Sequence, residues 1–180
     1  MSNDSSADMR WFHVILTMYG AWLPGDKRGF RTRKHRDHVE GDYKNPPEPG
    51  QYEGLAAHSQ KSLSHDPAML SFDQRQMVGL AMRDRLHQLD AVLACIAISR
   101  THGHLLVKLP PQETRKWVGL AKKHAWSELH NTGWNDKLWA KRPKFEPVRD
   151  RQHQMNVYRY ILRHEREGAF LWKHADGFRD

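Results

Sequence analysis

Apolar residues gather in four stretches of the chain that have the length and composition of β-strands. Residues 11–19 are rich in β-forming side chains, and residues 91–99 form a continuous apolar run bounded by polar residues, which suits a buried strand. The segment 98–109 is a further candidate, because its second half is apolar and two prolines end it. It follows the run 91–99 directly, so the two are expected to form a hairpin or one long bent strand. A short strand is also expected within 137–148.

Three helices are expected, and each has a recognisable first residue. Ser71 opens the first with a capping-box pattern, and this helix runs to about residue 89. Pro111 suits the first position of the second helix, which reaches about residue 129 and stops before Gly133. Asp150 can cap the third helix, which we expect from about residue 151 to 165.

The 180 residues suit a single domain with a core of its own. We expect a polar, flexible leader over residues 1–10, the domain over 11–172 and a tail over 173–180, with the apolar residues just before the tail docking on the core. Between about 31 and 66 the hydrophobic pattern dissolves, and prolines and basic residues take its place. A long excursion of this kind predicts an insertion on the surface of the domain.

The charge and the cysteine content narrow the class of protein. A net charge of +8 favours a polyanionic partner, most simply a nucleic acid, although a merely soluble basic protein has the same balance. The single cysteine, Cys95, excludes an internal disulfide framework and fits a reducing cytoplasm. No apolar run approaches the length of a membrane span, so no membrane contact is expected.

Two histidines lie two residues apart at the start of the strand candidate 98–109. Side chains two apart in a strand point to the same face, so His102 and His104 present two imidazoles side by side. Such a pair is half of a metal site, but two ordinary histidines in a His-rich chain would look the same. A partner elsewhere in the sequence must decide between these readings.

The third expected helix carries that partner. Tyr160 and His164 are four residues apart and therefore share one face of the helix. Laid near the histidine strand, this helix would bring a phenol and a third imidazole to the pair. The alternative is an ordinary amphipathic helix with a tyrosine and a histidine on its surface.

The strand with His-Gly-His and the helix with Tyr160 and His164 together resemble the single-tyrosine HUH transposases, most nearly the REP-associated tyrosine transposases. That family carries His-hydrophobic-His on a strand, then a helix with the tyrosine and a metal-binding Asn or Gln four residues later. The stretch Leu-Thr-Met-Tyr-Gly-Ala-Trp-Leu-Pro-Gly-Asp-Lys-Arg-Gly at 16–29 and the close at 160–171 resemble the same branch. The resemblance extends over roughly 11–172, in order.

Two positions depart from the family pattern. Gly103 stands where the family usually carries a hydrophobic residue, which could loosen the strand but leaves both histidines on one face. His164 stands where this branch usually has Asn. Since related nucleases use three histidines, the chemistry can survive this change, and an imidazole would shift the metal preference towards Mn²⁺.

The resemblance implies an α+β fold, with an antiparallel sheet of about four or five strands and helices packed on it, in the ferredoxin-like architecture of HUH nucleases. It implies that His102, His104 and His164 hold a divalent ion, Mg²⁺ or Mn²⁺. Tyr160 would be the nucleophile, and the DNA 5′ end would become covalently linked to it. Tyr158 lies about 200° away around the helix axis and suits core packing instead.

The implied substrate is single-stranded DNA that carries a hairpin. Five basic residues are candidates for contacts with its backbone, although a solvated charged face would have the same composition: Lys141, Arg142, Lys144, Arg149 and Arg151. A homodimer and a monomer both remain open. Two other functions also remain open: a catalytically silent, domesticated DNA-binding protein, and a small metallohydrolase that uses the histidines and water without a tyrosine intermediate.

Overall fold

A computed structural model describes residues 8–28, 30 and 48–175 of the chain. One antiparallel sheet organises them, with the strands in the order β4-β1-β3-β2-β5. Strands β2 and β3 are joined as a hairpin, in which the Ser99 N–H donates to the His102 carbonyl oxygen. The strands are β1 (Arg10–Thr17), β2 (Val92–Ile98), β3 (His102–Leu109), β4 (Lys144–Pro147) and β5 (Phe170–Lys173).

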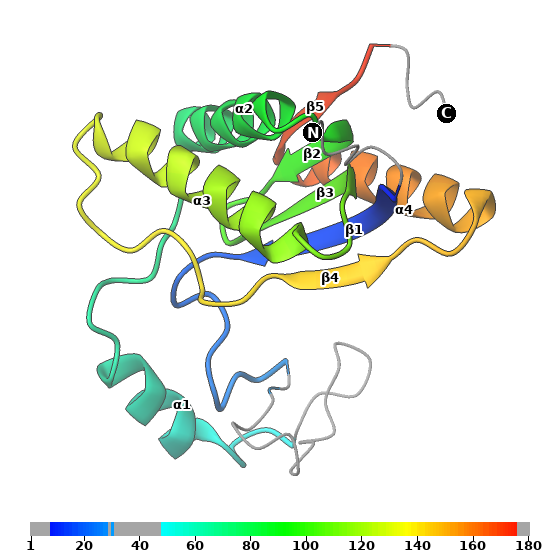
Figure 1. Ribbon diagram of the computed structural model, residues 1–180. Helices are drawn as coiled ribbons and strands as arrows, with labels where there is room; N and C mark the ends of the chain where they lie inside the picture. Colours follow the sequence, from blue (N-terminus) through cyan, green and yellow to red (C-terminus); the bar gives the residue numbers. More distant parts are fainter. Residues whose placement is uncertain (1–7, 29, 31–47, 176–180) are drawn as a thin grey trace.

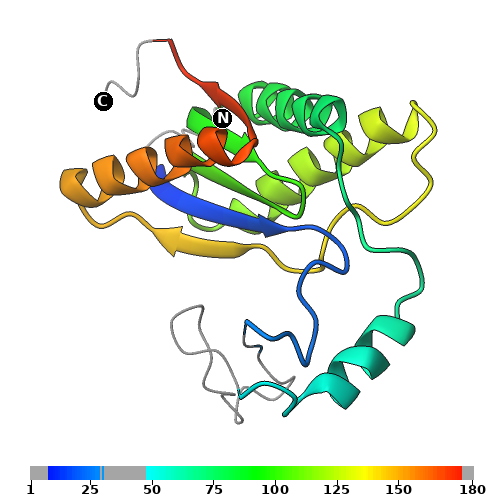
Figure 2. The ribbon, with the colours of Figure 1, turned by 180° about the vertical axis from the view of Figure 1, so that it is seen from behind.

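Helices cover both faces of this sheet. Helices α2 (Phe72–Gln88) and α3 (Thr114–His130) pack together on one face, and α4 (Arg151–Arg163) crosses the other face over β2 and β3 (Figure 1; Figure 2 shows the view from behind). The expected α+β architecture, an antiparallel sheet with helices packed on it, is confirmed, and the strand number is five.

The period-two alternation of the central strands divides the interior between the two helical layers. On β3, Leu105 and Val107 belong to the main core beneath α2 and α3, whereas Leu106 belongs to the smaller core beneath α4. His102 and His104 have the parity of Leu106 and therefore face α4. On β1, Val14 and Leu16 enter the main core, so His13 faces α4 as well.

The expected helix starts lie close to the observed ones. Ser71 caps α2 in a complete capping box: its side chain accepts from the Gln74 N–H, and the Gln74 side chain accepts from the Ser71 N–H. Asp150 caps α4 by accepting from the His153 N–H at 2.7 Å. Helix α3 begins at Thr114 instead of Pro111, because residues from Pro111 first form a turn.

The structure differs from expectation in three segments. Within the expected insertion, helix α1 (Glu53–Lys61) forms although none of its side chains is buried, while residues 31–47 lie outside the described residues. The segment expected to dock before the tail instead forms the edge strand β5, which extends to Lys173. Helix α4 ends at Arg163, and a 3₁₀ turn (His164–Glu167) continues the chain to Gly168 in the left-handed conformation. Among the described residues, no helix is both long and apolar enough to cross a bilayer.

Candidate metal and nucleophile site

Three histidines from two elements meet on the α4 side of the sheet. His102 and His104 lie at the start of β3, and His164 is the residue that follows α4. One ring nitrogen from each lies within 4.8 Å of the other two. The His104 and His164 rings stack at a centroid distance of 4.6 Å. The residue that follows α4 thus supplies the third imidazole that the strand pair lacks.

The Nδ1 atom of each of these rings contacts another group. His164 Nδ1 lies 3.1 Å from Glu167 Oε2, and His102 Nδ1 lies 3.4 Å from Thr101 Oγ1. His104 Nδ1 lies 3.0 Å from His13 Nε2. Because a carboxylate only accepts, His164 Nδ1 donates to Glu167, and its Nε2 keeps a lone pair. That Nε2 is buried without a hydrogen-bond partner. A buried acceptor of this kind suits a cation, and the donor set therefore fits a divalent metal ion.

His13 is a fourth histidine of the site and was not predicted from the sequence. It lies on β1 diagonally across from His104, which pairs with Ile15. Its Nδ1 lies 3.2 Å from Glu146 Oε2 on β4, so it donates to that carboxylate. Its Nε2 then accepts from His104 Nδ1, because a neutral imidazole has one donor and one acceptor nitrogen. This chain from Glu146 directs the Nε2 lone pair of His104 towards the other two histidines.

Burial favours the neutral form of His13, His102 and His104. Desolvation, together with the charges that the neighbouring His164, His102 and His13 would carry, lowers the pKa of His104 to about 2. Desolvation also lowers the pKa of His102 and of His13, although Glu146 partly opposes the shift of His13. Neutral imidazoles are the form that binds metal ions, so the lowered pKa of His102 and of His104 favours ion binding.

Tyr160 lies against the histidines, and Tyr158 does not. The Tyr160 ring is edge-on to His164 and to His104, at centroid distances of 5.0 Å and 5.3 Å, and the residue is 39% exposed. Tyr158 packs against the small core beneath α4, and burial raises its pKa. The α-helical period therefore separates the two phenols as expected, with one at the site and the other in the packing.

Gly103 does not loosen the strand, because its lack of a side chain permits close packing on the opposite face. A Cβ atom there would lie 2.8 Å from Ile98 Cδ1 and 3.3 Å from the Ala97 carbonyl oxygen. The neighbouring hairpin strand occupies the space that the usual hydrophobic residue would fill. This departure from the family pattern is a packing feature of the main core.

The five basic residues expected to bind DNA do not form one patch. Lys144 is nearest to the histidines, since its Nζ lies 2.6 Å from Glu146 Oε1. Lys141 and Arg142 are exposed and line a pocket against α3. Arg149 and Arg151 lie beyond the other end of β4, at the start of α4, where Arg151 donates to Gln154 Oε1.

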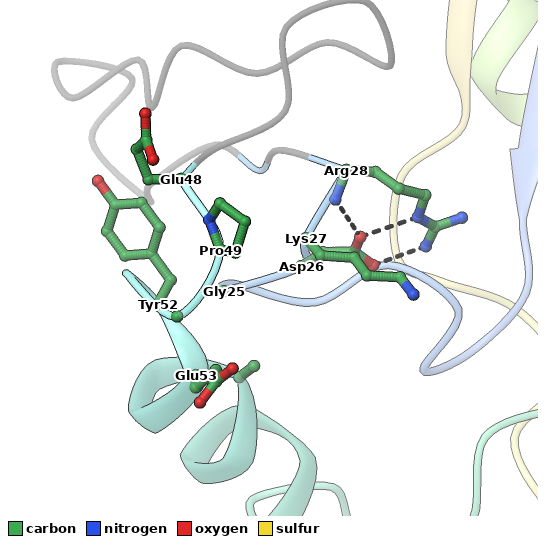
Figure 3. Close-up of a pocket in the computed structure, with 10 residues that line it drawn as sticks. Gly25, Asp26, Lys27, Arg28, Glu48, Pro49, Tyr52 and Glu53 are labelled. Carbon is green, nitrogen blue, oxygen red and sulfur yellow. Dashed lines mark hydrogen bonds and ion pairs between the residues drawn. The ribbon is translucent and has the colours of Figure 1, made fainter.

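A separate pocket of about 640 Å³ lies between residues 25–28 and the start of α1, and its lining contains none of the histidines (Figure 3). Asp26 accepts from the Arg28 guanidinium there at 2.6 Å, and the Arg28 side chain extends away from Tyr52. This ion pair lowers the pKa of Asp26, and the Arg28 charge contributes to the lowered pKa of His102. Arg28 is thus electrostatically coupled to the histidine site.

The comparisons with known proteins show a likeness at the level of solved structures. No protein-family model and no curated protein matches the sequence. Among solved structures, the chain is similar to a REP-associated tyrosine transposase bound to a REP hairpin, with 12% identity and a TM-score of 0.51. The match covers 88% of this chain and 68% of that protein. At this identity the likeness concerns the fold: this chain has the same arrangement of sheet and helices as a transposase structure.

Proposed function

We propose that this protein is a metal-dependent tyrosine transposase that cleaves and rejoins single-stranded, hairpin-bearing DNA. The observation that carries the proposal is the meeting of Tyr160 with three imidazoles on one side of the sheet. The fold shared with a transposase structure supports it, as does the net charge of +8. The proposed substrate class follows from this combination of nucleophile, donor set and charge.

His102, His104 and His164 are the residues that would hold the ion. A bound divalent metal would supply Lewis-acid polarisation of the scissile phosphate and offset the charge of the transition state. A site of three imidazoles is softer than one that contains an amide oxygen, so we expect Mn²⁺ to support activity better than Mg²⁺. Around it, Thr101, Glu167 and His13 hold the rings in orientation from their Nδ1 sides.

Tyr160 is the proposed nucleophile. Its phenolic oxygen would attack the phosphorus atom and lose its proton, and the bond to the 3′ oxygen would break. The departing 3′ oxygen takes up a proton, so the products are a 5′-phosphotyrosine link and a free 3′-OH. Arg163 lies with its guanidinium carbon 5.8 Å from the centre of the Tyr160 ring, where its charge favours the developing phenolate. The reverse reaction with another 3′-OH rejoins DNA and needs no ATP.

His13 and Glu146 are proposed as positioning residues. Neither is in the set of convergent metal-ligand candidates, but Glu146 fixes the tautomer of His13, and His13 fixes that of His104. Lys144 forms an ion pair with the other carboxylate oxygen of Glu146. Lys144 is also the DNA-contact candidate nearest the site, and the exposed Lys141, Arg142, Arg149 and Arg151 remain proposed contacts with the backbone.

The covalent intermediate provides the test. A labelled single-stranded hairpin DNA is incubated with the protein and Mn²⁺, and a denaturing gel reports the protein–DNA adduct. Tyr160→Phe should abolish the adduct and leave DNA binding within about twofold, because the substitution removes a single hydroxyl and keeps the ring. Tyr158→Phe, the matched control on the same helix, should keep the adduct.

Three other outcomes would contradict the proposal. An adduct that persists in Tyr160→Phe and disappears in Tyr158→Phe would show that Tyr158 is the nucleophile instead of Tyr160. Cleavage without any adduct would favour a metallohydrolase that uses water. DNA binding without cleavage, over several hairpins and with both metals, would favour a catalytically silent DNA-binding protein.

A further inference from the structure

A basic pocket lies on the α3 side of the sheet, whereas the histidines face α4. Its volume is about 320 Å³. Helix α3 contributes positions 115, 119 and 122, which share one helical face, and the segment before β4 contributes the rest. Four of the lining side chains are cationic and none is acidic: Arg115, Lys122, Lys141 and Arg142 line it with Gly119 and Pro143.

None of these four cations forms an ion pair with a carboxylate of the described residues. Elsewhere in the described chain, Arg28, Lys116 and Lys144 each form an ion pair with a nearby carboxylate. Positive charge without compensation around a concave surface is the arrangement that attracts a phosphate.

Lys122 is the most constrained of the four. Its Nζ donates to the Ala140 carbonyl oxygen at 3.0 Å and lies 5.6 Å from the centre of the Trp139 ring. Desolvation lowers the pKa of this ammonium, and no carboxylate opposes the shift. The lysine is therefore held in place in a partly dehydrated setting, where a nearby anion would stabilise its charged form.

Gly119 lines the pocket and leaves open space beside it. A Cβ atom at this position would meet no atom within 4 Å, so the space between the two α3 cations is empty of protein. The residue lies inside a regular helix, where glycine is less favourable than almost any other residue. An open position between cations on adjacent turns has room for a tetrahedral oxyanion.

We propose that this pocket binds a backbone phosphate of the DNA at a distance from the scissile phosphate. The inference rests on the proposed function. Residues 141–143 lead directly into β4, whose first residue, Lys144, contacts the Glu146 that orients the histidine site. The strand would thus pass from the histidines over Lys144 at the β4 edge of the sheet and reach the pocket on the other face.

Two variants separate the pocket from the overall charge. Gly119→Leu fills the pocket and keeps every charge, whereas Lys123→Gln removes one charge from an exposed position of the same helix outside the pocket. Binding is measured by fluorescence anisotropy with a labelled hairpin DNA that carries a long single-stranded extension, over a range of salt. Gly119→Leu should weaken binding about tenfold and reduce the salt slope by about one, while Lys123→Gln should stay within about twofold.

Two further measurements complete the test. Melting temperatures check the fold, and Arg115→Gln combined with Arg142→Gln replaces Gly119→Leu if that variant fails to fold. If the variant used binds the long DNA as Lys123→Gln does, the inference is overturned. A short oligonucleotide that covers only the cleavage site tests the proposed function separately. It should form an adduct with Gly119→Leu as it does with the unchanged protein. If neither protein forms an adduct, the result counts against Tyr160 chemistry but not against the pocket.

Discussion

His104 illustrates how a single residue depends on its neighbours for its chemical role. Its imidazole can present either nitrogen to a ligand, and the tautomer decides which one carries the lone pair. Glu146 accepts from His13, and His13 accepts from His104. The tautomer of His104 is therefore set by two residues that are not themselves proposed metal ligands. We expect these hydrogen bonds to raise the affinity for the ion more than they raise the stability of the fold.

Removing His13 should therefore weaken metal binding. His13→Phe keeps a ring but removes both hydrogen bonds, and we expect the affinity for Mn²⁺ to fall by about 10–100-fold in titration calorimetry. His13→Gln can place an oxygen near the position of Nε2 and should recover part of the loss. Melting temperatures without metal control for packing. If His13→Phe and His13→Gln both bind Mn²⁺ as tightly as the unchanged protein does, His13 does not position His104.

At the scale of elements, the edge strand β5 packs against α2 at a glycine. A Cβ atom on Gly79 would lie 2.5 Å from two atoms of the Phe170 ring and 3.4 Å from Ile98. Helix propensity disfavours glycine here, so the close approach of β5 outweighs it. Gly119 of α3 is the opposite case, since its Cβ would meet open space.

These two helical glycines predict opposite effects of the same substitution. Gly79→Ala should destabilise the fold by about 1–3 kcal/mol, because Phe170 must shift in a packed layer. Gly119→Ala should stabilise the fold by up to about 1 kcal/mol, because it gains helix propensity without a clash. Urea unfolding measures both. Equal stabilisation by the two substitutions would mean that Phe170 moves aside at no cost.

At the scale of the whole molecule, the buried neutral histidines link stability to pH. The pKa of His104 is about 2 in the folded chain, against about 6.5 for a histidine in an unfolded chain. Between these values the unfolded chain binds more protons, so lowering the pH destabilises the fold. The contribution of His104 to the free energy of unfolding is fully present above about pH 6.5 and is lost as the pH falls towards 2.

We therefore expect the metal-free protein to lose stability between pH 7 and pH 5. A histidine that is protonated in the unfolded chain and neutral in the folded one lowers the free energy of unfolding by at most about 1.4 kcal/mol for each pH unit below about 6.5. His102 and His13 add to the effect of His104, because their pKa values are lowered too. Urea unfolding in the presence of a chelator measures this slope. His104→Asn should make it shallower; an unchanged slope would assign the loss to other groups.

Local periodicity allowed the sequence by itself to determine a large part of this protein. The caps at Ser71 and Asp150 follow from local residue patterns, and the shared faces within single elements follow from spacings of two and four residues. These spacings placed His102 beside His104 and Tyr160 beside His164 before the elements were assembled. For β2 and β3 the sequence left a hairpin and one long bent strand open, and the structure has the hairpin. The general α+β architecture was predicted from the family resemblance.

Tertiary structure alone decided what depends on pairing between distant segments. His13 was missed because its neighbour is set by the β1–β3 register, which places it diagonally from a residue 91 positions away. The outer strand β5 and the exposed helix α1 were missed because short elements with few buried residues carry weak patterns. The basic residues look continuous in sequence, yet β4 separates them, because a strand carries the chain from one end of the sheet to the other.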